Sequence, residues 1–172
     1  MYAFLNKLFL FCIFSDSIFA APPAESKPNR VLAAKRAVCT PASLEDTSKD
    51  DTPAIKAAIT SCGNGGTIVI PAGKTYSIRT KLDFAGCVNC DFQLEGTLKV
   101  SSDTAYWATQ SAILNLSKIK GAKIRSLTKA GVIDGNGQNA YDIFAGDSSL
   151  ARPTVLYISG GSDITVTGFT SK

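Results

Sequence analysis

Few side chains in this 172-residue chain have the type and spacing that catalysis requires. Asp50 and Asp51 are adjacent carboxylates, and Asp134 stands in a glycine-rich turn. The basic pair Arg79 and Lys81 could meet an anionic substrate through charge-assisted hydrogen bonds. Histidine, the side chain that titrates nearest neutral pH, is absent. Any acid–base chemistry would therefore depend on carboxylates alone.

The neighbouring sequence favours structural roles for these groups. The paired aspartates precede Thr52-Pro53 and a helical apolar pattern, so we expect them to stabilise the positive end of a helix. Asp134 has no second carboxylate beside it to drive two pKa values apart, so it is interpreted as a turn residue. Arg79 and Lys81 fall between two predicted strands and are interpreted as a solvated turn. The sequence therefore predicts no catalytic residue, metal or cofactor.

The first 36 residues carry processing signals. Lys7, an apolar run and a small-residue cut after Ala20 are typical of a secretory signal peptide over 1–20, and Asp16 makes the run too short for a membrane anchor. Residues 21–36 form a propeptide or linker that ends in Lys35-Arg36, a predicted cleavage site. The remaining domain, 37–172, is expected to be secreted and extracellular, with no membrane association.

Removal of this segment also changes the charge. It takes five basic and two acidic residues from a chain of net charge +4, so the remaining domain carries +1. The basic precursor therefore gives no reason to expect a nucleic acid partner.

Four cysteines remain after the signal peptide, and an even number in an oxidising compartment favours disulfides. Four cysteines allow three pairings, which the sequence leaves open; our first choice is Cys39–Cys62 with Cys87–Cys90. The Cys87-x-x-Cys90 spacing alone does not make a zinc site, because no histidine or second pair accompanies it.

One helix is predicted before a series of strands. Thr52 is the expected N-cap, Pro53 suits the first turn, and Gly63 is expected to close the helix in the left-handed conformation. Its apolar residues fall on one face: Ile55, Ala58, Ile59 and Cys62. No second long helical pattern follows. Nine short strands follow instead, around residues 68–70, 76–78, 92–94, 98–100, 113–116, 122–124, 132–134, 156–158 and 164–166.

The strand spacing indicates a solenoid. Val69 and Gln93 are 24 residues apart, Gln93 and Asn115 22, and Ile133 and Tyr157 24. Such coils would stack inward apolar side chains in a column, with the helix covering the first coil. A β-sandwich is the alternative, because its short strands look similar.

Several segments resemble a known family: 50–73, 131–137, 152–158 and 162–166 are similar to the pectin-lyase-like superfamily and, within it, to the polygalacturonases of glycoside hydrolase family 28. Residues 87–98 look most like fungal exo-acting polygalacturonases or xylogalacturonan hydrolases. The resemblance spans about 39–172. It implies an all-β, right-handed parallel β-helix, a single-stranded solenoid with a short N-terminal capping helix.

The resemblance also implies a function, a secreted pectin-degrading hydrolase that cleaves α-1,4-galacturonosyl linkages with inversion. Its partner would be pectic galacturonan, and a monomer is expected. The family motifs Asn-Thr-Asp and Gly-His-Gly are absent. We therefore expect an inactive N-terminal fragment, truncated at its C-terminal side. The alternatives are a non-catalytic polysaccharide-binding solenoid and a pectate-lyase-type fragment.

Three further residues have predicted roles. Asn115-Leu116-Ser117 is a glycosylation sequon, which requires the Asn115 side chain to point outward. Tyr106 and Trp107 lie in a predicted polar loop, where they could stack on sugar rings but are expected to pack the loop onto a coil.

Overall fold

The computed structural model describes residues 36–172. The expected signal peptide with its Ala20 cut lies outside them, as does Lys35, whereas Arg36 is included and is exposed. The described elements are, in chain order, β1 Val38–Cys39, α1 Thr52–Cys62, β2 Thr67–Ile70, β3 Thr75–Ile78, β4 Leu82–Asp83, β5 Asp91–Leu94, β6 Thr97–Val100, α2 Thr104–Trp107, β7 Ala112–Asn115, β8 Lys123–Arg125, β9 Val132–Asp134, α3 Gln138–Gly146, β10 Thr154–Tyr157, β11 Thr165–Thr167 and β12 Thr170–Ser171.

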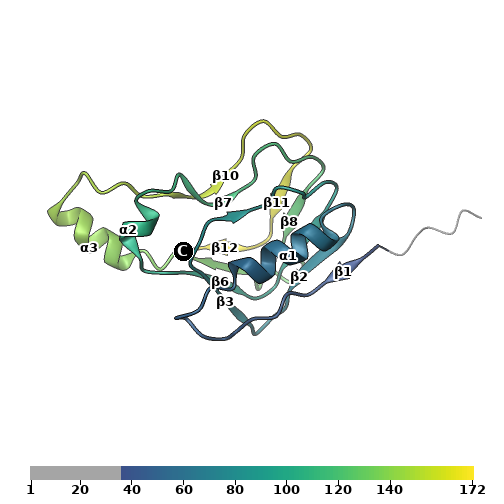
Figure 1. Cartoon of the computed structure of the whole chain (residues 1–172), viewed down its shortest axis with the longest axis horizontal. Coiled ribbons are helices and arrows are strands. Elements are labelled where there is room, and N and C mark those ends of the chain that lie inside the picture. Colours follow the sequence, from purple (N-terminus) through teal and green to yellow (C-terminus); the bar gives the residue numbers. More distant parts are fainter. Residues whose placement is uncertain (1–35) are drawn as a thin grey trace, which may run out of the picture. The chain divides into compact units, whose positions relative to one another are not determined.

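The strands form three parallel sheets. We call them sheet 1 (β1-β2-β5-β8-β11), sheet 2 (β12-β9-β6-β3) and sheet 3 (β10-β7-β4). Every pairing is parallel, and the chain visits sheets 1, 2 and 3 in turn before it begins the next coil (Figure 1). Consecutive strands therefore lie in different sheets. The predicted parallel β-helix is confirmed, and the β-sandwich alternative is wrong.

The core is a column of inward side chains in register between coils. In sheet 1, Ile68 lies opposite Phe92, and Phe92 lies opposite Ile124; all three are fully buried. In sheet 3, the fully buried Leu82 and Leu114 stack in the same way. Each such side chain contributes about 1.5–3 kcal/mol by leaving water. The outward residues alternate with them and are free to carry other functions.

One corner of the coil has a constant length. Ten residues separate the inward leucine of sheet 3 from the inward residue that follows in sheet 1: Leu82 to Phe92, Leu114 to Ile124, and Leu156 to Val166. Four and seven residues after each leucine the backbone is left-handed, with φ between 52° and 95°: Gly86 and Asn89, Lys118 and Gly121, Gly160 and Asp163. The same turn is therefore repeated in each coil, and its geometry sets the stacking.

The corner from sheet 2 to sheet 3 grows from coil to coil. The separation of matched inward residues rises from six to 16 to 23: Tyr76 to Leu82, Leu98 to Leu114, and Ile133 to Leu156. The added residues contain α2 and α3, which the sequence prediction of a single helix missed. This corner is therefore where the structure departs from a regular solenoid.

The predicted period is correct only for the first coil. Val69 and Gln93 are true partners in adjacent coils of sheet 1. Asn115 and Tyr157, in contrast, belong to sheet 3, so their spacings from Gln93 and Ile133 compare different sheets. The observed coil length instead rises along the chain, because the corner from sheet 2 to sheet 3 lengthens.

Helix α1 covers the first coil, and its predicted apolar face is buried against β1 to β4 (Figure 1). Its predicted ends need correction. Asp51, not Thr52, is the residue before the helix, and the Thr52 hydroxyl donates to the Thr80 carbonyl at 3.2 Å. Gly63 has φ −69°, not a left-handed value. Glycine is required there because a Cβ would lie 2.3 Å from the Ile59 carbonyl oxygen.

Two disulfides reinforce these features. Cys39–Cys62 joins β1 to the end of α1, and Cys87–Cys90 lies within the constant corner. This is the pairing that the sequence analysis preferred. In the next coil Ile119 and Ala122 occupy the positions equivalent to Cys87 and Cys90, and all four are buried. The second disulfide thus takes the place of core side chains.

Candidate functional site

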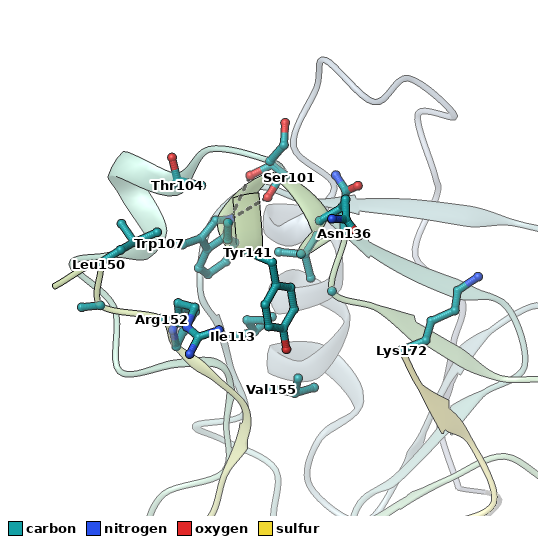
Figure 2. Close-up of a pocket in the computed structure, with 18 of the residues that line it drawn as sticks. Ser101, Thr104, Trp107, Ile113, Asn136, Tyr141, Leu150, Arg152, Val155 and Lys172 are labelled. Carbon is teal, nitrogen blue, oxygen red and sulfur yellow. Dashed lines mark hydrogen bonds between the residues drawn. The ribbon is translucent and has the colours of Figure 1, made fainter. Parts of the chain in front are cut away.

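The two long connections from sheet 2 to sheet 3 flank a cavity of about 820 Å³ (Figure 2). We call it the corner cleft. One wall comes from residues 101–111 with α2, the other from residues 135–153 with α3. Its lining includes Ser101, Trp107, Ile113, Tyr141, Arg152, Val155 and Lys172. The cleft forms between the two longest connections from sheet 2 to sheet 3, because these contain the added residues of α2 and α3.

The α2 wall is hydrogen-bonded to the coil. Asp103 accepts a hydrogen bond from the Tyr106 amide at 3.0 Å and so caps the helix. The Trp107 indole donates to the carbonyl and hydroxyl oxygens of Ser101, both at 3.0 Å, and the residue is only 6% exposed. The Tyr106 hydroxyl accepts from the Lys81 amide at 3.0 Å. Both aromatic residues therefore pack their segment onto the coil, and Trp107 forms part of the cleft wall.

The α3 wall is held differently. None of the nine residues of α3 is buried, and Tyr141 is 63% exposed. The Arg152 guanidinium carbon lies 4.1 Å from the centroid of the Phe144 ring and 5.1 Å from that of Tyr141. Such cation–π contacts contribute about 0.5–1 kcal/mol at exposed sites. The sequence analysis assigned no role to these three residues, because nothing in their spacing shows that α3 folds back onto Arg152.

The charged side chains that line the cleft are basic. Arg152 and Lys172 are the charged residues in its lining, and no aspartate or glutamate lines it. The Lys172 ammonium lies 3.8 Å from an Asp134 carboxylate oxygen. Arg152 takes part in none of the ion pairs found within residues 36–172. The cleft can therefore attract an anion and offer it an uncompensated guanidinium.

Asp134 lies on β9 at the edge of this region. One of its carboxylate oxygens accepts the Asn136 amide at 2.9 Å, as a turn aspartate does. Because no aspartate or glutamate lines the cleft, the described residues bring together no acid and base for glycoside hydrolysis there.

The paired aspartates lie away from the cleft and serve the fold. Asp51 is fully buried, and its carboxylate accepts the amides of Leu44 and Ser77, both at 2.8 Å. The Asp50 carboxylate accepts the Thr52 amide at 3.1 Å and the Thr80 hydroxyl at 2.7 Å. Burial alone would raise the pKa of Asp50, but these hydrogen bonds outweigh it and hold the pKa below its ordinary value.

The turn of Arg79 and Lys81 is less free than predicted. The Arg79 amide donates to Asp50 at 3.0 Å, and its guanidinium donates to the Thr47 carbonyl at 3.0 Å. Lys81 is tied through its amide to Tyr106. The segment is a partly exposed turn between β3 and β4, as predicted, and it is also hydrogen-bonded on both sides.

Asn115 is on the outer side of β7 and is partly exposed. Its side-chain amide donates to Asp83 at 3.1 Å, and its oxygen accepts from the Ser117 hydroxyl at 2.6 Å. Glycosylation there stays a prediction. Within residues 36–172, no group of three side chains is placed to hold a metal, and no helix has the length and apolar character needed to cross a membrane.

No protein-family model matches the chain, but individual relatives do. A probable endo-xylogalacturonan hydrolase A of Aspergillus fumigatus is 56% identical over 167 residues, which cover 97% of this chain and 41% of the relative. Endo-xylogalacturonan hydrolase A of Aspergillus tubingensis is 49% identical over 170 residues, 99% of this chain and 42% of that protein. This chain thus spans about two fifths of the length of these relatives.

A solved structure agrees. The crystal structure of endo-xylogalacturonan hydrolase from Aspergillus tubingensis matches with a TM-score of 0.77 and 55% identity, over 78% of this chain and 36% of that one. Fold and cleft define the class as a pectin-lyase-like parallel β-helix. Within that class, the chain belongs to glycoside hydrolase family 28, the polygalacturonase family.

Proposed function

We propose that this chain contributes the substrate-binding coils of a secreted glycoside hydrolase that degrades pectin. The proposed substrate is a galacturonan backbone with xylose side groups, as the names of the relatives indicate. The observation that carries this proposal is the corner cleft, which presents two cations and no carboxylate beside aromatic side chains. Galacturonan carries one carboxylate on each backbone sugar that is not esterified, so its charge complements the basic side chains of the cleft.

The cleft also suits the neutral part of such a substrate. Ile113 and Val155 form an apolar floor, and Tyr141 presents an exposed ring above it. Sugar rings have apolar faces that aromatic side chains bind by stacking. A volume of about 820 Å³ is within the range of small-molecule sites and accommodates more than one sugar.

Bond cleavage needs groups that this cleft does not supply. Inverting glycosidases place an acid and a base about 6.5–9.5 Å apart on either side of the scissile bond. Asp134, at the edge of the cleft, is held by the Asn136 amide and Lys172. We therefore propose that this chain binds pectic polysaccharide and, by itself, does not cleave it. A non-catalytic binding solenoid describes the same behaviour.

Two measurements on the purified 172-residue chain test this proposal. Co-sedimentation with insoluble de-esterified pectin should retain the chain, whereas neutral arabinan should not. Release of reducing ends from polygalacturonate and xylogalacturonan should stay at the level of a blank. Equal retention on both polymers would contradict the proposed binding site, and reducing-end release above the blank would contradict the assignment as non-catalytic.

The proposed route of secretion has its own test. N-terminal sequencing of the chain secreted by a fungal host should give a start at Ala21 or, after cleavage behind Lys35-Arg36, at Ala37. A start at Met1 would refute both. Light scattering of the secreted chain should give the mass of a monomer, and a stable dimer would contradict that expectation.

A further inference from the structure

Arg152 differs from Arg125 in how its guanidinium is held. Arg125 is already satisfied, because its guanidinium donates twice to Asp91, both at 2.7 Å. Arg152 has no such partner among residues 36–172, although it lines the corner cleft. Two ring faces hold it instead, those of Phe144 and Tyr141. A cation in this situation has unused hydrogen-bonding capacity.

The chemistry of guanidinium explains what that capacity is for. Its delocalised plane stacks on aromatic rings through its faces, while its five N–H donors point outward in that plane. Ring contacts therefore fix the orientation of Arg152 without consuming its donors. A planar carboxylate fits two of these parallel donors at once, in a bidentate pair. Lys172 lacks this fork, lies near Asp134 already, and stands across the Tyr141 ring from Arg152 (Figure 2).

We propose that Arg152 is the residue that recognises a uronate carboxylate in the corner cleft, and that Phe144 and Tyr141 are its positioning residues. This inference rests on the proposed function and names the residue that would make the cleft specific for acidic sugars. It gives α3 a role as well. Helix α3 buries no side chain in the coil. Its Tyr141 and Phe144 rings keep the Arg152 guanidinium in place, and the contacts with Arg152 in turn hold the helix. Acidic sugars should therefore bind better than their methyl esters, which have the same backbone but no charge.

The test compares two ligands on one set of variants. Isothermal titration calorimetry gives the affinities of the 172-residue chain for tetragalacturonate and for its fully methyl-esterified form. The unmodified chain should bind the acid about tenfold tighter, the discrimination expected of one charge-assisted pair. Arg152→Gln should lower this ratio by about tenfold through weaker acid binding alone. Arg152→Lys keeps the charge but loses the two parallel donors, so the ratio of acid affinity to ester affinity should fall between those of the unmodified chain and Arg152→Gln.

A control and a positioning variant complete the set. Arg125→Gln removes an arginine from outside the cleft and should leave the ratio unchanged. Phe144→Leu should weaken acid binding several-fold and leave ester binding intact, a split that a purely structural effect would not produce. Near-ultraviolet circular dichroism checks that each variant is folded.

The outcomes separate the two proposals. If the unmodified chain prefers the acid and Arg152→Gln keeps that preference, the role of Arg152 is refuted while the proposed function stands. If the chain binds acid and ester equally, carboxylate recognition is refuted as well. If it binds neither ligand, the proposed function and this inference fail together.

Discussion

Replacing Asp51 should damage the fold more than replacing any exposed carboxylate. The Asp51 side chain is fully buried and accepts the amides of Leu44 and Ser77, both at 2.8 Å, so it ties the loop before α1 to strand β3. Asp51→Ala leaves the buried Ser77 amide without that acceptor, at a cost of about 1–3 kcal/mol. The Leu44 amide is reached by water and adds about 1 kcal/mol. We expect the free energy of unfolding to fall by about 3 kcal/mol.

Urea unfolding followed by the fluorescence of Trp107, the single tryptophan, measures this change. The slope of the transition should stay constant while its midpoint falls. Asp46→Asn is the control, because the Asp46 carboxylate belongs to the same loop, is solvent-accessible, and contacts only the nearby Ser48 and Lys49. It should leave the midpoint unchanged. A midpoint for Asp51→Ala equal to that of the control would refute the reasoning.

Three further predictions concern stability. Burial would raise the pKa of Glu95, but hydrogen bonds from Thr128 and neighbouring groups hold that pKa below 4.5. The ionised Glu95 side chain therefore stabilises the fold above pH 4.5, and this stabilisation is lost as the pH falls through the lowered pKa. The urea midpoints of the parent and Glu95→Gln should differ at pH 7, and the difference should shrink as the pH falls below 4.5; a constant difference would contradict this. Cys39→Ser opens a loop of 23 residues and should reduce the free energy of unfolding by about 3 kcal/mol, and an unchanged melting temperature would count against it. Gly168→Ala should cost more than Gly73→Ala in the same assay, because both have positive φ but only at Gly168 would a Cβ meet the backbone, 2.4 Å from the Ser126 carbonyl oxygen; equal costs would disprove it.

The sequence predicted the parts of the fold that depend on local chemistry. The α1 face of Ile55 and Ile59 follows from helical spacing, and short β-branched strands between turn residues indicate a solenoid. The pairing Cys39–Cys62 agrees with a helix that covers the first coil. Each of these features is set within about 25 residues, so a local pattern is sufficient to reveal it.

The missed features depend on distant contacts. The Gly63 prediction failed because the close approach of two carbonyl oxygens, those of Ile59 and Gly86, and not a left-handed turn, demands glycine there. Helix α3 has apolar residues at helical spacing, among them Ala140, Ile143 and Phe144, but it is only nine residues long and buries none of them, so the sequence analysis did not identify it. Arg152 gains its significance only when Phe144, eight residues earlier, folds back onto it. The register between coils therefore had to be known before the cleft could be located.

The position of Trp107 allows the most direct test of the account. It is the single tryptophan, it lines the corner cleft, and it lies near Tyr141 and the proposed carboxylate receptor (Figure 2). Titration of the chain with xylogalacturonan oligosaccharides should change its emission in a saturable way, and rising salt should weaken that binding. Neutral arabinan oligosaccharides should produce no change. A response that is absent, or equal for both sugars, would contradict the claim that this cleft binds acidic polysaccharide.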